Sequence, residues 1–183
     1  MTEHDPTAVL AYWLIPAEPT RSFFSSLIKE LSERFDAPLF EPHLTIYSTS
    51  KGDQDAAEVL GRTFSVCEPF RLTVRDIEHS DELTKTLFVQ FEPDRRLSEA
   101  SDALRRASDR IDEYELNPHL SLIYQKIDPA VKSEVANSIT LPFAEVTFDL
   151  AKAIVSPAQI KSRKDVEAWR VLAARPLRPH QVQ

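Results

Sequence analysis

The hydrophobic and polar positions of the chain alternate with two different periods, which predicts strands and helices along its whole length. Short apolar or alternating segments, typical of strands, lie at residues 9–16, 43–48, 70–79, 83–93, 119–124, 145–156 and 166–177. Segments whose apolar residues recur every three or four positions, typical of amphipathic helices, lie at residues 20–35, 52–64, 95–111 and 129–138. Thr20 is a candidate N-cap for the first of these helices.

The order of these segments in the first half of the chain is repeated in the second half. A strand, a helix and a strand at 9–16, 20–35 and 43–48 correspond to a strand, a helix and a strand at 86–93, 95–111 and 119–124. Pro16 and Pro93, which end the first strand of each set, are offset by nearly the same number of residues as His43 and His119. We therefore predict an internal duplication of a strand–helix–strand unit, with both histidines beside one shared cleft.

The two histidines of the duplication lie in the same four-residue setting, Pro-His-Leu-Thr at 42–45 and Pro-His-Leu-Ser at 118–121. Alternation along a strand places His43 and Thr45 on one face, and His119 and Ser121 likewise. Hydrolysis of a phosphodiester needs one group that takes a proton from water and another that protonates the leaving oxygen. Two imidazoles, with an ordinary pKa near 6.5, suit these roles, and the hydroxyls could donate to the phosphoryl oxygens.

Other interpretations of the histidines are open at this point. A single histidine on a half-buried strand is most often structural, but recurrence of the whole quartet at equivalent points favours catalysis. A serine–histidine nucleophile is disfavoured because no nucleophile elbow is present. A metal site has little support, since the sequence has no HxH, HExxH or clustered Cys–His pattern. We expect no metal and no cofactor.

Composition narrows the class of protein. The 183 residues suffice for one domain, or for two small lobes with a common core. A net charge of −7 disfavours stable binding of long nucleic acid. The only two glycines, Gly52 and Gly61, are isolated, which excludes a P-loop and a GxGxxG dinucleotide site. The single Cys67 and the lack of a signal peptide or a membrane-spanning run predict a cytoplasmic location without membrane attachment.

The paired H-x-T/S-x motifs, in "FEPHLTI" and "NPHLSLIY", resemble those of the two-histidine (2H) phosphoesterase superfamily. "AYWLIP" and "DVEAWRVLA" are similar to the first and last strands of its cyclic phosphodiesterase branch. The resemblance covers roughly the first 175 residues. It implies one bilobal α+β domain at 1–175, with antiparallel sheets around a central cleft, and leaves a flexible tail at 176–183.

The same resemblance implies hydrolysis of 2′,3′-cyclic nucleotides to nucleoside 2′-phosphates, and of ADP-ribose 1″,2″-cyclic phosphate to ADP-ribose 1″-phosphate. His119 would activate water and His43 would protonate the leaving oxygen, although the sequence itself does not assign these roles. Thr45 and Ser121 would bind the phosphoryl group, and Tyr124 would line the pocket. The small nucleotide substrate would be the only partner of a monomer. Processing of RNA 2′,3′-cyclic phosphate ends and a non-catalytic nucleotide-binding module are the alternatives.

Residue patterns alone give a different expectation for several side chains near these motifs. Strict alternation places Tyr124 with Leu120 and Leu122, on the face opposite His119. Tyr47 shares the face of His43 but suits packing equally well. Four further expectations concern residues outside the motifs: Trp13 and Trp169 as core residues, Lys85 as a solvated charge, and Phe88 as a weak candidate for stacking on a nucleobase.

Overall fold

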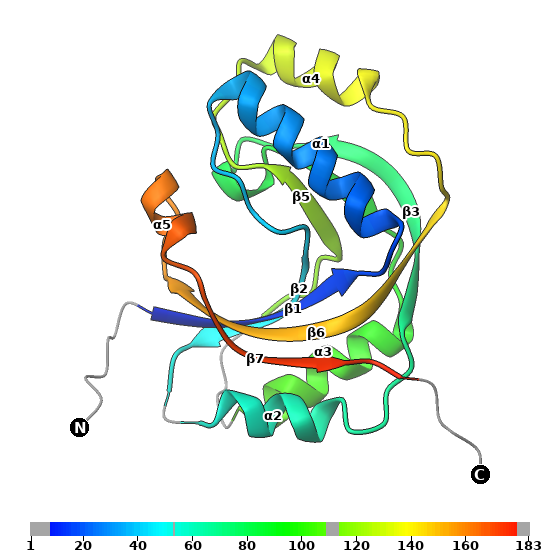
Figure 1. The fold of residues 1–183 in the computed structure, drawn as a ribbon, viewed down its shortest axis with the longest axis vertical. Helices are drawn as coiled ribbons and strands as arrows, with labels where there is room; N and C mark the ends of the chain where they lie inside the picture. The colour runs from blue at the N-terminus through cyan, green and yellow to red at the C-terminus, as the bar shows by residue number, and fades with distance from the viewer. Residues whose placement is uncertain (1–7, 53, 109–113, 179–183) are drawn as a thin grey trace.

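The computed structural model describes residues 8–52, 54–108 and 114–178 (Figure 1). The strands are β1 (Ala8–Pro16), β2 (Leu44–Ser50), β3 (Phe70–His79), β4 (Leu87–Phe91), β5 (His119–Ile123), β6 (Glu145–Pro157) and β7 (Arg170–Pro176). The helices are α1 (Thr20–Phe35), α2 (Ala56–Thr63), α3 (Arg95–Ala107), α4 (Pro129–Ser138) and α5 (Arg163–Glu167), with a 3₁₀ turn at Leu83–Lys85. The α+β class is confirmed.

The strands form one antiparallel sheet, in the order β1-β2-β5-β4-β3-β6-β7. β6 also pairs with β1, so six strands close into a ring and β7 extends it along the free part of β6. In the view of Figure 1, α1 and α4 lie above β1 and β6, and α2 and α3 lie below them. The two predicted units are therefore joined in one continuous sheet. β2 begins directly after His43 and β5 begins at His119, and these two strands share only the pair Leu44–Leu120.

The duplication is visible in how the strands of each unit pair. Trp13 pairs with Thr45 and Tyr12 with Tyr47, which leaves Ile46 as an extra, bulged residue of β2. In the second unit Phe88 pairs with Ser121 and Leu87 with Ile123, which leaves Leu122 as the bulged residue of β5. Ile46 and Leu122 hold the same place after their histidines, so both units contain the same β-bulge.

This pairing corrects the alignment of the first strands. Trp13 of β1 corresponds to Phe88 of β4, because each pairs with the hydroxyl residue of its own histidine motif. Counted along the strands, Pro16 is then level with Phe91 and not with Pro93. The segments that join the first strand to the helix, residues 17–19 and 92–94, are therefore equally long in the two units. The one-residue change in offset falls between the start of the helix and the histidine.

Each helix of the duplication covers the histidine strand of the other unit. α1 packs against β5, and α3 packs against β2. Ser101 of α3 donates a hydrogen bond of 2.7 Å to the carbonyl oxygen of Ile46, the bulged residue. This contact gives the bulge a partner from across the unit boundary, so the two halves depend on each other for their fold.

Several element boundaries differ from the sequence predictions. The N-cap of α1 is Pro19 rather than Thr20, whose hydroxyl instead donates to the carbonyl oxygen of Ala17. The strand predicted at 83–93 is shorter, because a 3₁₀ turn takes its first residues. The start of the strand predicted at 166–177 belongs to α5, which begins at a capping box between Ser162 and Asp165. Ile111, the predicted end of α3, lies outside the described residues.

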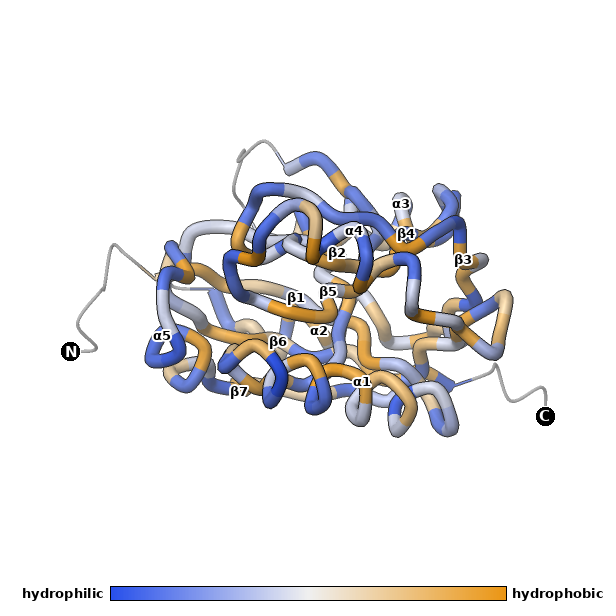
Figure 2. Tube along the Cα trace, turned by 90° about the horizontal axis from the view of Figure 1, so that it is seen from above, coloured by the Kyte–Doolittle hydropathy of each residue, from blue (hydrophilic) through white to orange (hydrophobic). Residues whose placement is uncertain are grey.

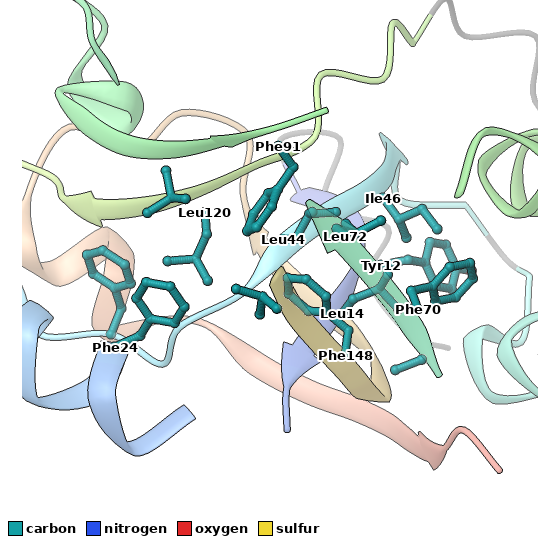
Figure 3. Close-up of a cluster of buried hydrophobic side chains, with 14 of the residues drawn as sticks. Tyr12, Leu14, Phe24, Leu44, Ile46, Phe70, Leu72, Phe91, Leu120 and Phe148 are labelled. Carbon is teal, nitrogen blue, oxygen red and sulfur yellow. The ribbon is translucent and has the colours of Figure 1, made fainter. Parts of the chain in front are cut away.

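The core lies between the sheet and its helices. Hydrophobic and hydrophilic residues alternate along α1 (Figure 2), and Phe24, Ile28 and Leu31 form its buried side. Leu14, Leu44 and Phe148 lie together between the strands (Figure 3). Each large side chain fully buried in this way contributes about 1.5–3 kcal/mol.

The C-terminal segment is ordered beyond the point where the tail was expected to begin. Leu177 is buried, and its N–H donates to the carbonyl oxygen of Asp149. The N–H of Arg178 donates to the carbonyl oxygen of Cys67. Residues 179–183 lie outside the described residues, so their flexibility stays a prediction. Within the described ranges, no helix is long and apolar enough to cross a membrane.

Candidate active site

Both histidines of the duplicated motif line one pocket of about 320 Å³. Thr45 and Ser48 of β2 line the same pocket, as does Tyr124, the residue that follows β5. The pocket therefore lies where the histidine strands of the two units meet.

The two imidazoles are held in the same way. Nδ1 of His43 lies 2.7 Å from the carbonyl oxygen of Glu41, and Nδ1 of His119 lies 2.7 Å from the carbonyl oxygen of Asn117. A carbonyl oxygen can only accept, so each Nδ1 carries the proton of the neutral ring. Each Nε2 of the neutral form is consequently a proton acceptor.

The surroundings of the two rings disfavour the imidazolium form. The pKa of His43 is lowered from 6.5 to about 4, mainly by burial, against the opposing effect of the hydrogen bond to the Glu41 carbonyl oxygen. The positive charges of His119 and Lys152 make smaller contributions in the same direction as burial. Burial also lowers the pKa of His119, and the ammonium of Lys85 acts in the same direction. His43 is only 5% exposed, while His119 is half-buried. Both rings are thus neutral in the unliganded protein near pH 7, and a bound anion would raise both pKa values.

The two motif hydroxyls have different surroundings. Thr45 lines the pocket, and its carbonyl oxygen accepts a hydrogen bond of 3.1 Å from the Tyr114 hydroxyl. Ser121 is buried and donates a hydrogen bond of 2.6 Å to the carbonyl oxygen of Thr84. Ser121 does not line the pocket, whereas Thr84 does. Binding of a phosphoryl group by Ser121 stays a prediction, and it would require this hydrogen bond to break.

Tyr124 lies in the pocket, contrary to the expectation from strict alternation. The bulge at Leu122 shifts the alternation by one residue, so Tyr124 returns to the side of the sheet that carries His119. Ser48 reaches the pocket in the same way after the bulge in β2. The Tyr124 hydroxyl lies 3.5 Å from Nε2 of His43, and its ring stacks on Phe40 with centroids 4.2 Å apart. Burial raises the pKa of this hydroxyl, which keeps it protonated.

Aromatic rings surround His43 more closely than the sequence indicates. Trp13 is buried, as expected, but it also lines the pocket and stacks on the His43 ring with centroids 3.7 Å apart. Trp169 meets the same ring edge to face at 5.6 Å. At the other histidine, Phe88 lies at 5.5 Å from the His119 ring. Trp13 and Phe88 occupy equivalent places in the duplication, a relation that a correct alignment of the first strands could have predicted.

Lys85 lines the pocket, although the sequence analysis took it for a solvated charge. It lines the pocket beside His119 and forms a 3.1 Å ion pair with Glu82, although its side chain is only 23% exposed. Thr84 and Lys85 lie in the connection between β3 and β4, and the hydrogen bond from Ser121 holds this connection against β5. No pattern of the sequence links a residue of this connection to the histidines.

Tyr47 belongs to the core. It lies after the bulge in β2, is fully buried, and packs against Tyr12 and Tyr114. Over 8–52, 54–108 and 114–178, no three or more His, Cys, Asp or Glu residues are grouped so that they could hold a metal ion.

Comparison with known proteins gives the family. The sequence profile of the 2′-5′ RNA ligase superfamily matches residues 16–155, which include both histidine motifs. The chain belongs to this superfamily. The resemblance to the two-histidine phosphoesterases is confirmed by this match.

Individual members of the superfamily are distant in sequence. A cyclic phosphodiesterase from Arabidopsis thaliana is 22% identical over 177 residues, which cover 93% of this chain and 96% of that protein. TT0787 of Thermus thermophilus has a TM-score of 0.61 at 16% identity, over 94% of this chain and all of that one. LigT of E. coli, solved with ATP, has a TM-score of 0.53 at 14% identity, over 93% and 98% of the chains. The two structures show the common fold.

Proposed function

We propose that the protein is a metal-independent cyclic phosphodiesterase that opens 2′,3′-cyclic nucleotides to nucleoside 2′-phosphates. The observation that supports this activity most strongly is the pair of imidazoles, His43 and His119, which line one pocket with Nδ1 held by a carbonyl oxygen in each. The name of the Arabidopsis relative supports the same reaction class. ADP-ribose 1″,2″-cyclic phosphate, opened to ADP-ribose 1″-phosphate, is a second substrate with the same reacting group.

The proposed reaction adds one water across one bond. The water oxygen forms a bond to phosphorus while one neutral imidazole takes a proton from it through Nε2. The bond from phosphorus to the 3′ oxygen breaks, and the other imidazole, protonated, gives its proton to that oxygen. Each proton transfer contributes roughly 10²–10⁴ in rate. The Thr45 hydroxyl and the Lys85 ammonium line the pocket and would stabilise the charge on the phosphoryl oxygens.

The resemblance assigns the role of general acid to His43 and the role of general base to His119. The burial of the two rings favours the opposite assignment. The more buried ring, His43, is the harder one to protonate, because desolvation disfavours its cation. We propose that His43 is the base and His119 the acid. Stacking on Trp13 holds the His43 ring in place, while His119 is more accessible to solvent protons.

The size and charge of the molecule favour a small substrate over a long RNA. A pocket of about 320 Å³ lies at the lower end of small-molecule sites and suits a single nucleotide. The net charge of −7 disfavours a long polyanion. We further propose that the protein is a monomer and that it acts in the cytoplasm. Light scattering tests the first point, and cell fractionation tests the second.

The decisive experiment is incubation with 2′,3′-cyclic AMP and excess EDTA, followed by ³¹P NMR. We expect the resonance of the cyclic phosphate to be replaced by that of the 2′-phosphate alone. Variants H43A and H119A should lose at least about 10²-fold in kcat, since each removes one proton-transfer group. Full activity of either variant would refute the acid–base pair.

The alternative functions give different results under the same conditions. Cleavage of an RNA oligonucleotide ending in a 2′,3′-cyclic phosphate, without turnover of the mononucleotide, would indicate an RNA end-processing enzyme. Calorimetric binding of the cyclic nucleotide without turnover of any cyclic phosphate would indicate a nucleotide-binding module.

A further inference from the structure

The two Nδ1 hydrogen bonds depend on backbone carbonyls that lie outside regular secondary structure. Glu41 belongs to the segment between α1 and β2, and Asn117 belongs to the segment before β5. No strand pairing fixes these carbonyls directly. Side chains hold both segments, and in the second one the N–H of Phe91 also donates to the carbonyl oxygen of Pro118 at 3.0 Å. Glu41 and Asn117 hold equivalent places, each two positions before its histidine.

A lysine from the sheet holds the first of these residues. Nζ of Lys152, on β6, lies 2.8 Å from Oε1 and 2.6 Å from Oε2 of Glu41. The lysine side chain is only 16% exposed. Lys152 pairs with Trp13 across β6 and β1, so it stands beside the ring that stacks on His43. The ion pair thus links the Glu41 segment to the sheet at the histidine.

A glutamine holds the second residue. The amide nitrogen of Gln90, on β4, donates to Oδ1 of Asn117 at 2.9 Å and to the carbonyl oxygen of Pro118 at 2.8 Å. Gln90 is 4% exposed and pairs directly with His119 across β4 and β5. The second unit therefore reaches the same arrangement with a neutral side chain from a different strand.

We infer that Lys152 and Gln90 are positioning residues, each of which fixes the carbonyl that orients one imidazole: Lys152 through Glu41 for His43, and Gln90 through Asn117 for His119. This inference deepens the proposed function, because it concerns the two rings that carry it. Neither residue lines the pocket. Each acts through its carbonyl by keeping the proton on Nδ1 and the lone pair of Nε2 directed toward the substrate. A displacement of about 1 Å in a reacting group can cost on the order of 10²-fold in rate.

The test is ¹⁵N NMR of the histidine side chains in the unliganded protein, at a pH where both rings are neutral. Wild type should show the Nδ1–H tautomer for His43 and His119. K152M should add the Nε2–H tautomer to His43 and leave His119 unchanged, while Q90M should do the reverse. K152R, which can still pair with Glu41, should restore the wild-type spectrum.

A matched control separates this effect from a general loss of stability. Arg21 forms a partly buried ion pair with Asp149, also on β6, and does not line the pocket. R21M should therefore change neither histidine. If K152M does not fold, E41A removes the same ion pair while the carbonyl remains, and the same selective change at His43 is expected. An unchanged His43 tautomer, or equal changes at both rings, would overturn the inference.

Kinetics provide a second readout. On 2′,3′-cyclic AMP, K152M and Q90M should each lower kcat roughly tenfold or more, with KM within about twofold of wild type. The reason is that each variant loses the orientation of one imidazole while the residues that line the pocket stay the same. A rise in KM without a change in kcat would contradict positioning. The tautomers are measured without substrate. A protein that shows selective tautomer changes but hydrolyses no cyclic phosphate would therefore refute the proposed function and leave the positioning roles standing.

Discussion

The burial of His43 predicts a specific loss of stability in mild acid. In the unfolded chain this ring has its ordinary pKa of 6.5, and in the folded protein burial lowers the pKa to about 4. Between these two values the unfolded state binds more protons, so the free energy of unfolding falls as the pH decreases. The full difference of the two pKa values corresponds to about 3 kcal/mol. This contribution to the free energy of unfolding is fully present above pH 6.5 and is lost completely below about pH 4.

The measurable part of this effect lies between about pH 7.5 and pH 5. Over this interval the proton linkage of His43 alone should lower the free energy of unfolding by roughly 2 kcal/mol. All other titrating groups are present in both wild type and a His43 variant. Comparison of wild type with H43Q, which has no titrating ring, isolates the contribution. Urea unfolding of both proteins at a series of pH values gives the two curves.

The expected result is a wild-type curve that falls more steeply than that of H43Q by roughly 2 kcal/mol over this interval. Inorganic phosphate, as an anion in the pocket, should reduce the difference by raising the pKa of the ring. Parallel curves in buffer without phosphate would show that His43 titrates normally in the folded protein. That result would also remove the basis for assigning the role of base to His43.

Three further predictions concern the reaction on the proposed substrate. Lys85→Met should raise KM for 2′,3′-cyclic AMP by about tenfold and weaken its salt dependence, because a charge-assisted contact to the phosphate is lost; an unchanged KM would place the lysine outside the substrate contact. With a nitrophenyl phosphodiester, whose leaving group needs no proton, H119A should recover more activity than H43A if His119 is the acid; the opposite order would restore the assignment implied by the resemblance. Thr45→Ala should lower kcat, because a phosphoryl contact is lost. Ser121→Ala should instead release the Thr84 carbonyl, displace the connection that carries Lys85, and raise KM as Lys85→Met does. Equal losses of kcat in the two variants would favour Ser121 as a phosphoryl ligand.

The sequence predicted the parts of the fold that local patterns determine. The alternating and helical segments matched the described strands and helices closely, and the repeated quartet led to the two histidines that line the pocket. These features depend on periodicity and on a repeated motif, both of which are visible along one chain. The bounds of α1 were predicted correctly, but its N-cap was missed by one residue because Thr20 and Pro19 are both plausible at a helix N-terminus.

The rest of the site depends on contacts between distant segments. Tyr124 reaches the pocket only because of the bulge at Leu122, and a bulge is fixed by how two strands pair rather than by one strand's sequence. Lys85 reaches the pocket because Ser121 holds the connection that carries it. Lys152 lies more than a hundred residues from Glu41, so its role follows from the order of the strands. No local pattern in the sequence indicates any of these contacts.

The differences between the two units would let a duplicated fold carry out the asymmetric reaction that we propose. Acid–base catalysis requires one group that accepts a proton and one that supplies it, and two identical sites would titrate alike. Here the bulges, the Nδ1 hydrogen bonds and the flanking aromatic rings are repeated, while the charges and the burial are not. His43 lies buried under Trp13, with the ammonium of Lys152 near its ring. His119 is more exposed and lies beside Lys85, which belongs to the connection between β3 and β4. The repeated features give both rings the same tautomer, and the unrepeated ones place the two rings in different surroundings, as the proposed opposite roles would require.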